Sequence, residues 1–178
     1  NGSFENDLTG WTSTGNMQIR NSTPYVPTNG TKLLAFNTGQ SAPNGVISQS
    51  FPTVSGQTYQ VEFDLGLLAY NTSSQRIQLA VTGAGSLLSQ SITVTGNGSG
   101  SRWLPQSFSF VANSTTTTLS FTDTSTTSTN LDLLLDNVRV TGSTPSYTLT
   151  VASSPASSLA VAISPPDRNS ASGGTTSF

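Results

Sequence analysis

The side chains that could do chemistry in this chain are few, and most of them are carboxylates. The 178 residues contain eight Asp and Glu, no His and no Cys. A glycosidase needs two carboxylates about 5–9.5 Å apart, and the close pairs are Glu62 with Asp64 and Asp132 with Asp136. The first pair is spaced i, i+2, which places both on one face of a strand, where we expect solvent. Without His or Cys, only Ser–Lys arrangements around Lys32 could activate a nucleophile, so we expect no enzymatic activity.

A metal ion is the second use that these carboxylates suggest. Glu5 and Asp136 stand near the two ends of the strand-rich region, each beside apolar residues. A carboxylate near a core needs a partner, because burying an isolated charge is costly. Calcium binds six to eight oxygen ligands and could join the two ends of the domain. A salt bridge, or hydrogen bonds from backbone amides, would satisfy the same carboxylates and stays an open alternative.

Sugar binding is the third chemistry that the residue types allow. It needs an aromatic face against the apolar side of a pyranose, and polar side chains against the hydroxyls. Tyr70 and Tyr25, at strand ends next to loops, are the expected ring contacts, whereas Trp11 and Trp103 are expected to pack in the core. The candidate ligand-binding residues are Tyr70, Asn71, Gln75, Arg76, Gln78 and Tyr25. The alternative is that Tyr70 caps the sheet and Arg76 is merely solvated.

The composition excludes other functions. Net charge is −2 and six cationic side chains are spread over the chain, too few for the basic surface that nucleic-acid binding requires. No apolar run approaches the roughly 20 residues of a membrane span. Ser and Thr fill 58 of 178 positions and charged residues only 8%. Such a hydroxyl-rich surface is typical of extracellular bacterial modules, so we expect a secreted protein, either free or displayed at the cell surface.

Short runs of alternating apolar and polar residues, separated by turn signals such as Asn29-Gly30, indicate strands rather than helices. Nine strands at this spacing predict an antiparallel sandwich. The expected strands are 17–20, 32–36, 46–51, 58–69, 76–81, 91–95, 102–111, 117–122 and 133–141.

Four short motifs follow one another along the chain. They are Asn1-Gly2-Ser3-Phe4-Glu5, Gly10-Trp11, Gly56-Gln57-Thr58-Tyr59 and, at the end, Leu134-Leu135-Asp136-Asn137-Val138. This ordered set resembles the galactose-binding-like jelly-roll superfamily, particularly the xylan- and glucan-binding modules of secreted bacterial proteins. The resemblance covers residues 1 to about 142. It implies an all-β, two-sheet jelly-roll sandwich, in which we expect the first and last strands to be adjacent. It also implies a structural calcium held by Glu5, Asp136 and backbone carbonyls near Ser3 and Lys32.

The domain organisation follows from a change in composition near Gly142. We expect a jelly-roll domain over 1–142, a linker over 143–146, and an incomplete immunoglobulin-like β segment over 147–178, similar to the start of a bacterial surface repeat. The leading hypothesis is a non-catalytic carbohydrate-binding module that tethers a larger secreted or cell-surface protein to a polysaccharide. The alternative is a structural or adhesive repeat of a surface protein or fibre that binds no sugar.

The domain boundary generates a first prediction. The segment 147–151 alternates Tyr, Leu and Val with Thr, so one face is apolar and must be covered, by its own domain or by a neighbouring chain. The expected closing strand of the sandwich ends before Gly142, so truncation after that residue should leave cooperative thermal unfolding intact. Loss of cooperativity in calorimetry would place the boundary elsewhere and would favour the fibre, in which consecutive units complete one another.

Overall fold

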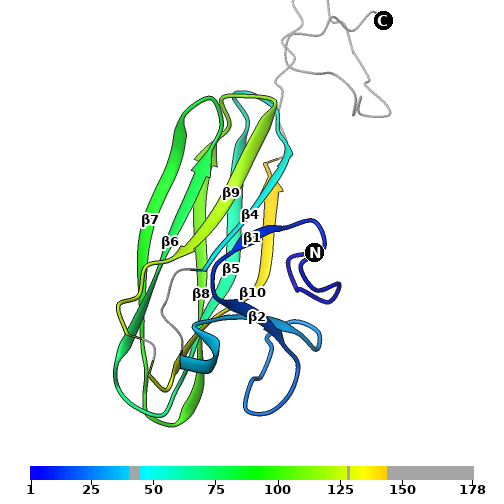
Figure 1. Ribbon diagram of the computed structural model, residues 1–178. Helices are drawn as coiled ribbons and strands as arrows, with labels where there is room; N and C mark the ends of the chain where they lie inside the picture. The colour runs from blue at the N-terminus through cyan, green and yellow to red at the C-terminus, as the bar shows by residue number, and fades with distance from the viewer. Residues whose placement is uncertain (41–44, 128, 144–178) are drawn as a thin grey trace, which may run out of the picture. The chain divides into compact units, whose positions relative to one another are not determined.

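The computed structural model describes residues 1–40, 45–127 and 129–143, and these form two packed β-sheets (Figure 1). Sheet A has the order β1-β4-β9-β6-β7 and sheet B the order β2-β3-β10-β5-β8. All pairings between neighbouring strands are antiparallel. The strands of sheet A are β1 (Thr12–Thr14), β4 (Val46–Pro52), β6 (Ser74–Thr82), β7 (Ser86–Thr95) and β9 (Thr116–Asp123). The strands of sheet B are β2 (Met17–Arg20), β3 (Leu33–Phe36), β5 (Thr58–Ala69), β8 (Gly100–Val111) and β10 (Leu131–Gly142).

The predicted fold class is confirmed, and all nine expected strands are present with shifts of a few residues at their ends. The largest difference is β7, which begins at Ser86 rather than Ser91. Strand β1 was not predicted, because its three residues Thr-Ser-Thr are all exposed and carry no apolar alternation. In the described ranges no helix is long and apolar enough to cross a membrane. The expected immunoglobulin-like segment lies outside the described residues.

The core lies between the inner faces of the two sheets. Along β5 every second residue from Tyr59 to Ala69 is buried, as the period of two in a strand requires. Aromatic rings join the sheets at the centre, where Phe63 of β5 meets Phe121 of β9 edge to face, with ring centroids 4.9 Å apart. Trp11 is 9% exposed and belongs to this core, as predicted.

Strand β10 lies in the interior of sheet B, between β3 and β5. The expected adjacency of the first and last strands is therefore wrong: β1 pairs with β4 in the other sheet, and β2 pairs with β3. The N-terminal segment reaches β10 through one backbone hydrogen bond, from the Val138 amide to the Gly2 carbonyl at 2.8 Å. The register of β10 against β5 shifts between Asp136 and Arg139. The hydrogen bond from Val138 to Gly2 falls within this irregularity.

The outer face of sheet B carries a second apolar cluster. Its buried members come from three strands, and they are Leu33, Ala35, Leu68 and Leu134. Trp103 and Tyr25 pack against them, so Trp103 belongs to this cluster and not to the core between the sheets, where it was expected. The segment 21–32 lies against this face, since the Trp103 indole donates a hydrogen bond to the Val26 carbonyl at 3.0 Å. The cluster is thus shielded by a segment that has no strand of its own.

Gly66 makes this arrangement testable. A Cβ atom at Gly66 would lie 2.5 Å from Cε3 of the Trp103 ring, so Gly66→Ala must displace the indole from the sheet. Overpacking of this kind costs about 1–3 kcal/mol, and we expect that loss in the free energy of unfolding measured by urea denaturation. Gly85→Ala is the matched control, because nothing lies within 4 Å of a Cβ atom there. Equal stability of the two variants would contradict the packing of Trp103 on Gly66.

Candidate functional site

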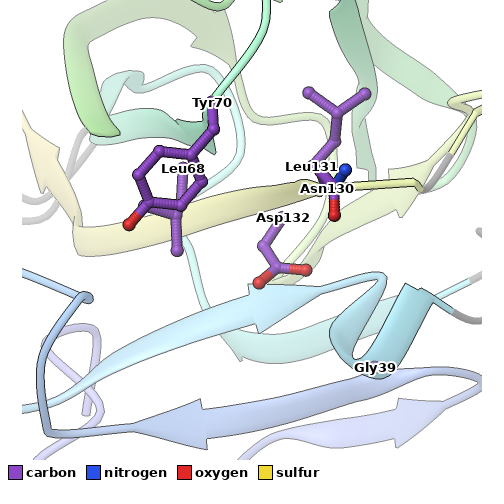
Figure 2. Close-up of a pocket in the computed structure, with 6 residues that line it drawn as sticks. All are labelled: Gly39, Leu68, Tyr70, Asn130, Leu131 and Asp132. Atoms are coloured by element: carbon purple, nitrogen blue, oxygen red, sulfur yellow. The ribbon is translucent and has the colours of Figure 1, made fainter. Parts of the chain in front are cut away.

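A hollow of about 210 Å³ opens at one end of sheet B (Figure 2). Strands β5 and β10 position it, because Leu68 and Asp132 are direct partners in their ladder and Tyr70 follows the last residue of β5. Gly39, in the short 3₁₀ segment Thr38–Gln40, forms another part of the wall. The lining residues are Gly39, Leu68, Tyr70, Asn130, Leu131 and Asp132.

Tyr70 presents an aromatic surface at this hollow. Its side chain is 63% exposed, although large apolar surfaces in this protein are mostly buried. The turn that follows is fixed by Asn71, whose Oδ1 accepts a hydrogen bond from the Ser73 amide at 2.9 Å. In Figure 2 the Tyr70 ring and the Asp132 carboxylate lie on neighbouring parts of the hollow. An open ring beside a polar group is a combination that can bind a sugar ring, through its apolar face and its hydroxyls.

Asp132 is held as an acceptor by Tyr25. The Tyr25 hydroxyl donates to Oδ2 of Asp132 at 2.6 Å, while no hydrogen bond within the described residues reaches Oδ1. Burial raises the pKa of Asp132, opposed by the Tyr25 hydrogen bond and by the positive charge of Arg20. Burial and the Asp132 hydrogen bond raise the pKa of Tyr25 to about 12, so the phenol keeps its proton. The Arg20 guanidinium lies 5.1 Å from the centre of the Tyr25 ring, in the range of a cation–π contact.

The six predicted ligand-binding residues do not form one site. Tyr70 and Asn71 lie at the hollow or next to it, and Tyr25 reaches it only through Asp132. Gln75 is 1% exposed, and its side-chain amide forms hydrogen bonds with Asn37 and Thr127. The prediction that Gln75 contacts a ligand at the surface was therefore wrong.

Arg76 and Gln78 point away from this region of sheet B. They alternate along β6 with the buried Ile77 and Leu79, so they lie on the outer face of sheet A. The Arg76 side chain donates to the Thr124 hydroxyl at 3.2 Å, and Gln78 donates to the Ser89 hydroxyl at 2.9 Å. The sequence grouped these residues with Tyr70 because they follow one turn, but the strand that carries them belongs to the other sheet.

Sequence reasoning missed Asp132, Asn130 and Gly39 as site residues. The signal for Asp132 was its place in an apolar strand, with Leu134 and Asp136 on the same face at a spacing of two. Asn130 has a φ of 59° and Gly39 a φ of 70°, and such left-handed turns occur where a loop reverses next to a strand end. Neither position could be assigned to this hollow before β3, β5 and β10 were known to be neighbours.

Comparison with known proteins agrees with this architecture. The family of proteins of unknown function DUF642 matches residues 3–141. The chain belongs to the DUF642 family. No curated protein sequence matches it.

Solved structures share the fold of this DUF642 domain. A family 61 carbohydrate-binding module, TmCBM61, in complex with beta-1,4-galactotriose, is 16% identical with a TM-score of 0.57, over 79% of this chain and 94% of that one. A family 35 module (CBM35) from Paenibacillus barcinonensis is 25% identical with a TM-score of 0.50, over 76% and 95%. The C-terminal family 22 module of Clostridium thermocellum Xyn10B is 16% identical with a TM-score of 0.53, over 78% and 89%. The predicted resemblance to jelly-roll carbohydrate-binding modules is confirmed.

In this DUF642 domain the carboxylates expected to hold calcium face hydrogen-bond donors. Oε1 of Glu5 accepts from the Thr31 and Lys32 amides, both at 2.8 Å, and Oε2 accepts from the Thr31 hydroxyl at 2.8 Å. These bonds lower the pKa of Glu5, the backbone bond from Thr31 most. The Lys32 ammonium pairs with the Asp7 carboxylate at 2.7 Å.

Asp136 is fully buried and has the same kind of surroundings. Its Oδ2 accepts from the Thr28 amide at 2.8 Å, the Asn29 amide at 2.9 Å and the Thr28 hydroxyl at 3.1 Å. Its Oδ1 accepts from the Asn137 amide at 2.7 Å. Burial raises the pKa of Asp136, and these amide bonds oppose the increase.

This donor set does not fit a calcium ion. Calcium needs six to eight oxygens with lone pairs directed at it, but Oε1 of Glu5 and Oδ2 of Asp136 already accept two and three hydrogen bonds. No group of three acidic side chains suited to a metal occurs among the described residues. The geometry favours the open alternative of hydrogen bonds from amides, and calcium binding stays a prediction of the sequence.

Chelation distinguishes the two possible partners of Glu5 and Asp136, which are a calcium ion and hydrogen bonds from amides. A ligand at 100 times its dissociation constant adds about 2.7 kcal/mol to stability, so removal of a bound calcium would lower the melting temperature visibly. We expect the same melting curve in EDTA and in added calcium. Asp136→Ala should lower the free energy of unfolding by about 2–5 kcal/mol in either buffer, because it leaves buried amides without an acceptor. Asp7→Ala is the control, an exposed ion pair worth at most about 1 kcal/mol. A chelator effect that disappears in Asp136→Ala would restore the calcium site.

Proposed function

We propose that this domain is a non-catalytic carbohydrate-binding module that binds a neutral sugar residue in the hollow beside Tyr70. The observation that carries the proposal is an open aromatic ring, 63% exposed, next to the half-buried carboxylate of Asp132. The fold supports the proposal, because the similar structures include modules of families 61, 35 and 22, one of them in complex with beta-1,4-galactotriose.

The lining chemistry suits a neutral sugar. The apolar face of a pyranose would stack on Tyr70, and its hydroxyls would donate to Oδ1 of Asp132, the oxygen that Tyr25 leaves open. None of the six lining residues is cationic, so an acidic sugar would meet the Asp132 carboxylate with no cation in the wall of the hollow to offset the repulsion.

The proposed role in the larger protein is attachment. A module of this kind would tether a secreted or cell-surface polypeptide to a polysaccharide, with its other domains or neighbouring chains doing further work. Catalysis is not expected at the hollow, because among the described residues Asp132 is the only carboxylate that lines it and general acid–base hydrolysis needs two.

A glycan array followed by calorimetry tests the proposal. We expect binding of neutral oligosaccharides, and a loss of about tenfold or more in affinity for Tyr70→Ala, since a stacked aromatic contact contributes about 0.5–1.5 kcal/mol beyond its buried area. Tyr70→Phe should retain most of the affinity, and Asp132→Asn should weaken binding at an unchanged fold. Arg76→Ala is the matched control, an exposed polar residue on the outer face of the other sheet.

Two results would contradict the proposed sugar site. Absence of binding to any neutral glycan, or equal losses in Tyr70→Ala and Arg76→Ala, would refute the site. Absence of binding would favour the alternative function, a structural or adhesive repeat without a sugar ligand.

A further inference from the structure

A polar cluster closes the end of the core behind the hollow. Asn37 follows β3 and is fully buried, Gln75 lies on the inner face of β6 and is 1% exposed, and Asp123 ends β9 on its inner face and is 5% exposed. The three side chains come from both sheets. Buried polar groups need hydrogen-bond partners, because an unpaired one costs about 1–3 kcal/mol.

The Thr127 carbonyl determines which amide atoms donate and which accept in this cluster. The Thr127 carbonyl can only accept, so it takes the Nε2 amide hydrogen of Gln75. Oε1 of Gln75 therefore faces Nδ2 of Asn37, which donates to it. Oδ1 of Asn37 is then left as an acceptor, and it has no hydrogen-bond partner although it is buried. Reversing either amide would set oxygen against oxygen at Thr127 or at Gln75.

Asp123 presents a second acceptor without a partner. Its Oδ1 accepts from the Ser125 amide at 2.9 Å, but its Oδ2 is buried and unpaired. The Asn37 side chain lies near enough to act on this carboxyl, and a hydrogen bond donated by it, like those from Ser125, would lower the pKa of Asp123. The Nδ2 group of Asn37 already donates to Gln75, however, and does not bond Oδ2 of Asp123, so Oδ1 is the Asn37 atom left for Asp123. The cluster therefore contains two buried acceptor oxygens without a partner, Oδ1 of Asn37 and Oδ2 of Asp123. One hydrogen-bond donor placed between them would satisfy both.

Within the part of the chain that the structure describes, no charged side chain supplies that donor. On β6 the neighbouring charge is Arg76, which is exposed and directed at Thr124. Strands β4 and β7 and the described residues 37–40 contain no ionisable side chain, and the inner face of β10 at this end is Leu131 and Leu133. Asp132, the nearest acidic residue of β10, lies on the outer face of sheet B and bonds Tyr25.

We propose that Asp123 is a neutral carboxylic acid whose proton joins its Oδ2 to Oδ1 of Asn37, so that Asp123, Asn37 and Gln75 form one chain of hydrogen bonds that positions the walls of the hollow. One wall is Gly39, two residues after Asn37, and the other is Asn130 and Leu131, beyond the Thr127 carbonyl that Gln75 holds. The link to ligand binding rests on the proposed function, whereas the hydrogen-bond chain itself does not.

The pH dependence of stability follows from the sign of the shift. Burial is the largest cause that raises the pKa of Asp123 above its usual value near 4. The folded protein then keeps a proton that the unfolded chain has lost. The contribution of Asp123 to stability is therefore greatest below about pH 4 and declines as the pH rises towards the folded pKa, by about tenfold in the folding equilibrium constant for each pH unit within that window.

Asp123→Asn is the decisive variant. The Asn amide can donate to Oδ1 of Asn37, and its oxygen can still accept from the Ser125 amide, with no proton to lose. We expect the wild type to lose stability relative to Asp123→Asn as the pH rises from 4 to 8, measured by urea denaturation. Asp7→Asn, at an exposed carboxylate, should track the wild type. A carbon-13 titration of the Asp123 carboxyl gives a direct reading and should show a pKa above its usual value near 4.

Several results would overturn the proposal. They are a wild type and an Asp123→Asn variant with the same pH dependence, an Asp123 carboxyl that titrates near 4, or an Asp123→Asn variant as unstable as Asp123→Ala. A wild type stabilised by calcium or sodium, with the effect lost in Asp123→Asn, would assign the cluster to a cation instead.

The positioning role has its own measurement. Gln75→Met keeps the side-chain size but breaks the chain between Asn37 and Thr127, and we expect it to weaken glycan binding while Gln78→Met, on the outer face of sheet A, does not. If no glycan binds, the stability and titration results still decide the protonation of Asp123. If Tyr70→Ala weakens binding but Gln75→Met does not, the positioning role fails and the proposed function stands.

Discussion

The structure depends on buried or half-buried carboxylates that must find donors on the outer face of sheet B. Strand β10 carries Asp132 and Asp136 on that face, with Leu134 between them. The donors come from the segment 21–32, through the Tyr25 hydroxyl and the amides of Thr28 and Asn29. Glu5 fixes the end of the same segment through the amides of Thr31 and Lys32. A segment without regular secondary structure thus becomes part of the fold, because Asp132 and Asp136 would otherwise be desolvated without compensation.

The same interaction connects the fold to the candidate site. Once the segment 21–32 is fixed, it covers the apolar cluster around Leu68 and Leu134 and holds the Trp103 indole. Tyr25 is placed so that its hydroxyl meets Asp132 from the covered side, which leaves the other side of that carboxylate towards the hollow. The site is built on residues that the sheet and its covering segment position together.

The strands of this domain were predictable because alternation of apolar and polar residues is a local property. Tyr59, Val61 and Phe63 alternate over three consecutive pairs, so β5 was found with its observed bounds. The site was less predictable, because it joins β3, β5 and β10 through register and sheet order, which no short pattern encodes. Gln75 illustrates why the site was harder to predict. A polar residue at the start of an alternating strand is expected to be exposed, whereas Gln75 is buried because its side chain bonds Asn37 and the Thr127 carbonyl. The carboxylates Glu5 and Asp136 were identified as structural, but the sequence could not distinguish amide donors from a metal ion as their partners.

Strand β10 runs the whole length of sheet B, with Leu131 beside the hollow and Gly142 paired with Tyr59 at the start of β5. Twelve residues of extended chain span about 40 Å, so the described chain leaves the sandwich at the end remote from Tyr70. A surface, a fluorophore or a fusion partner attached on that side would leave the approach to the hollow open. The direction of a single strand therefore determines how the domain can be immobilised while its hollow stays accessible from solvent.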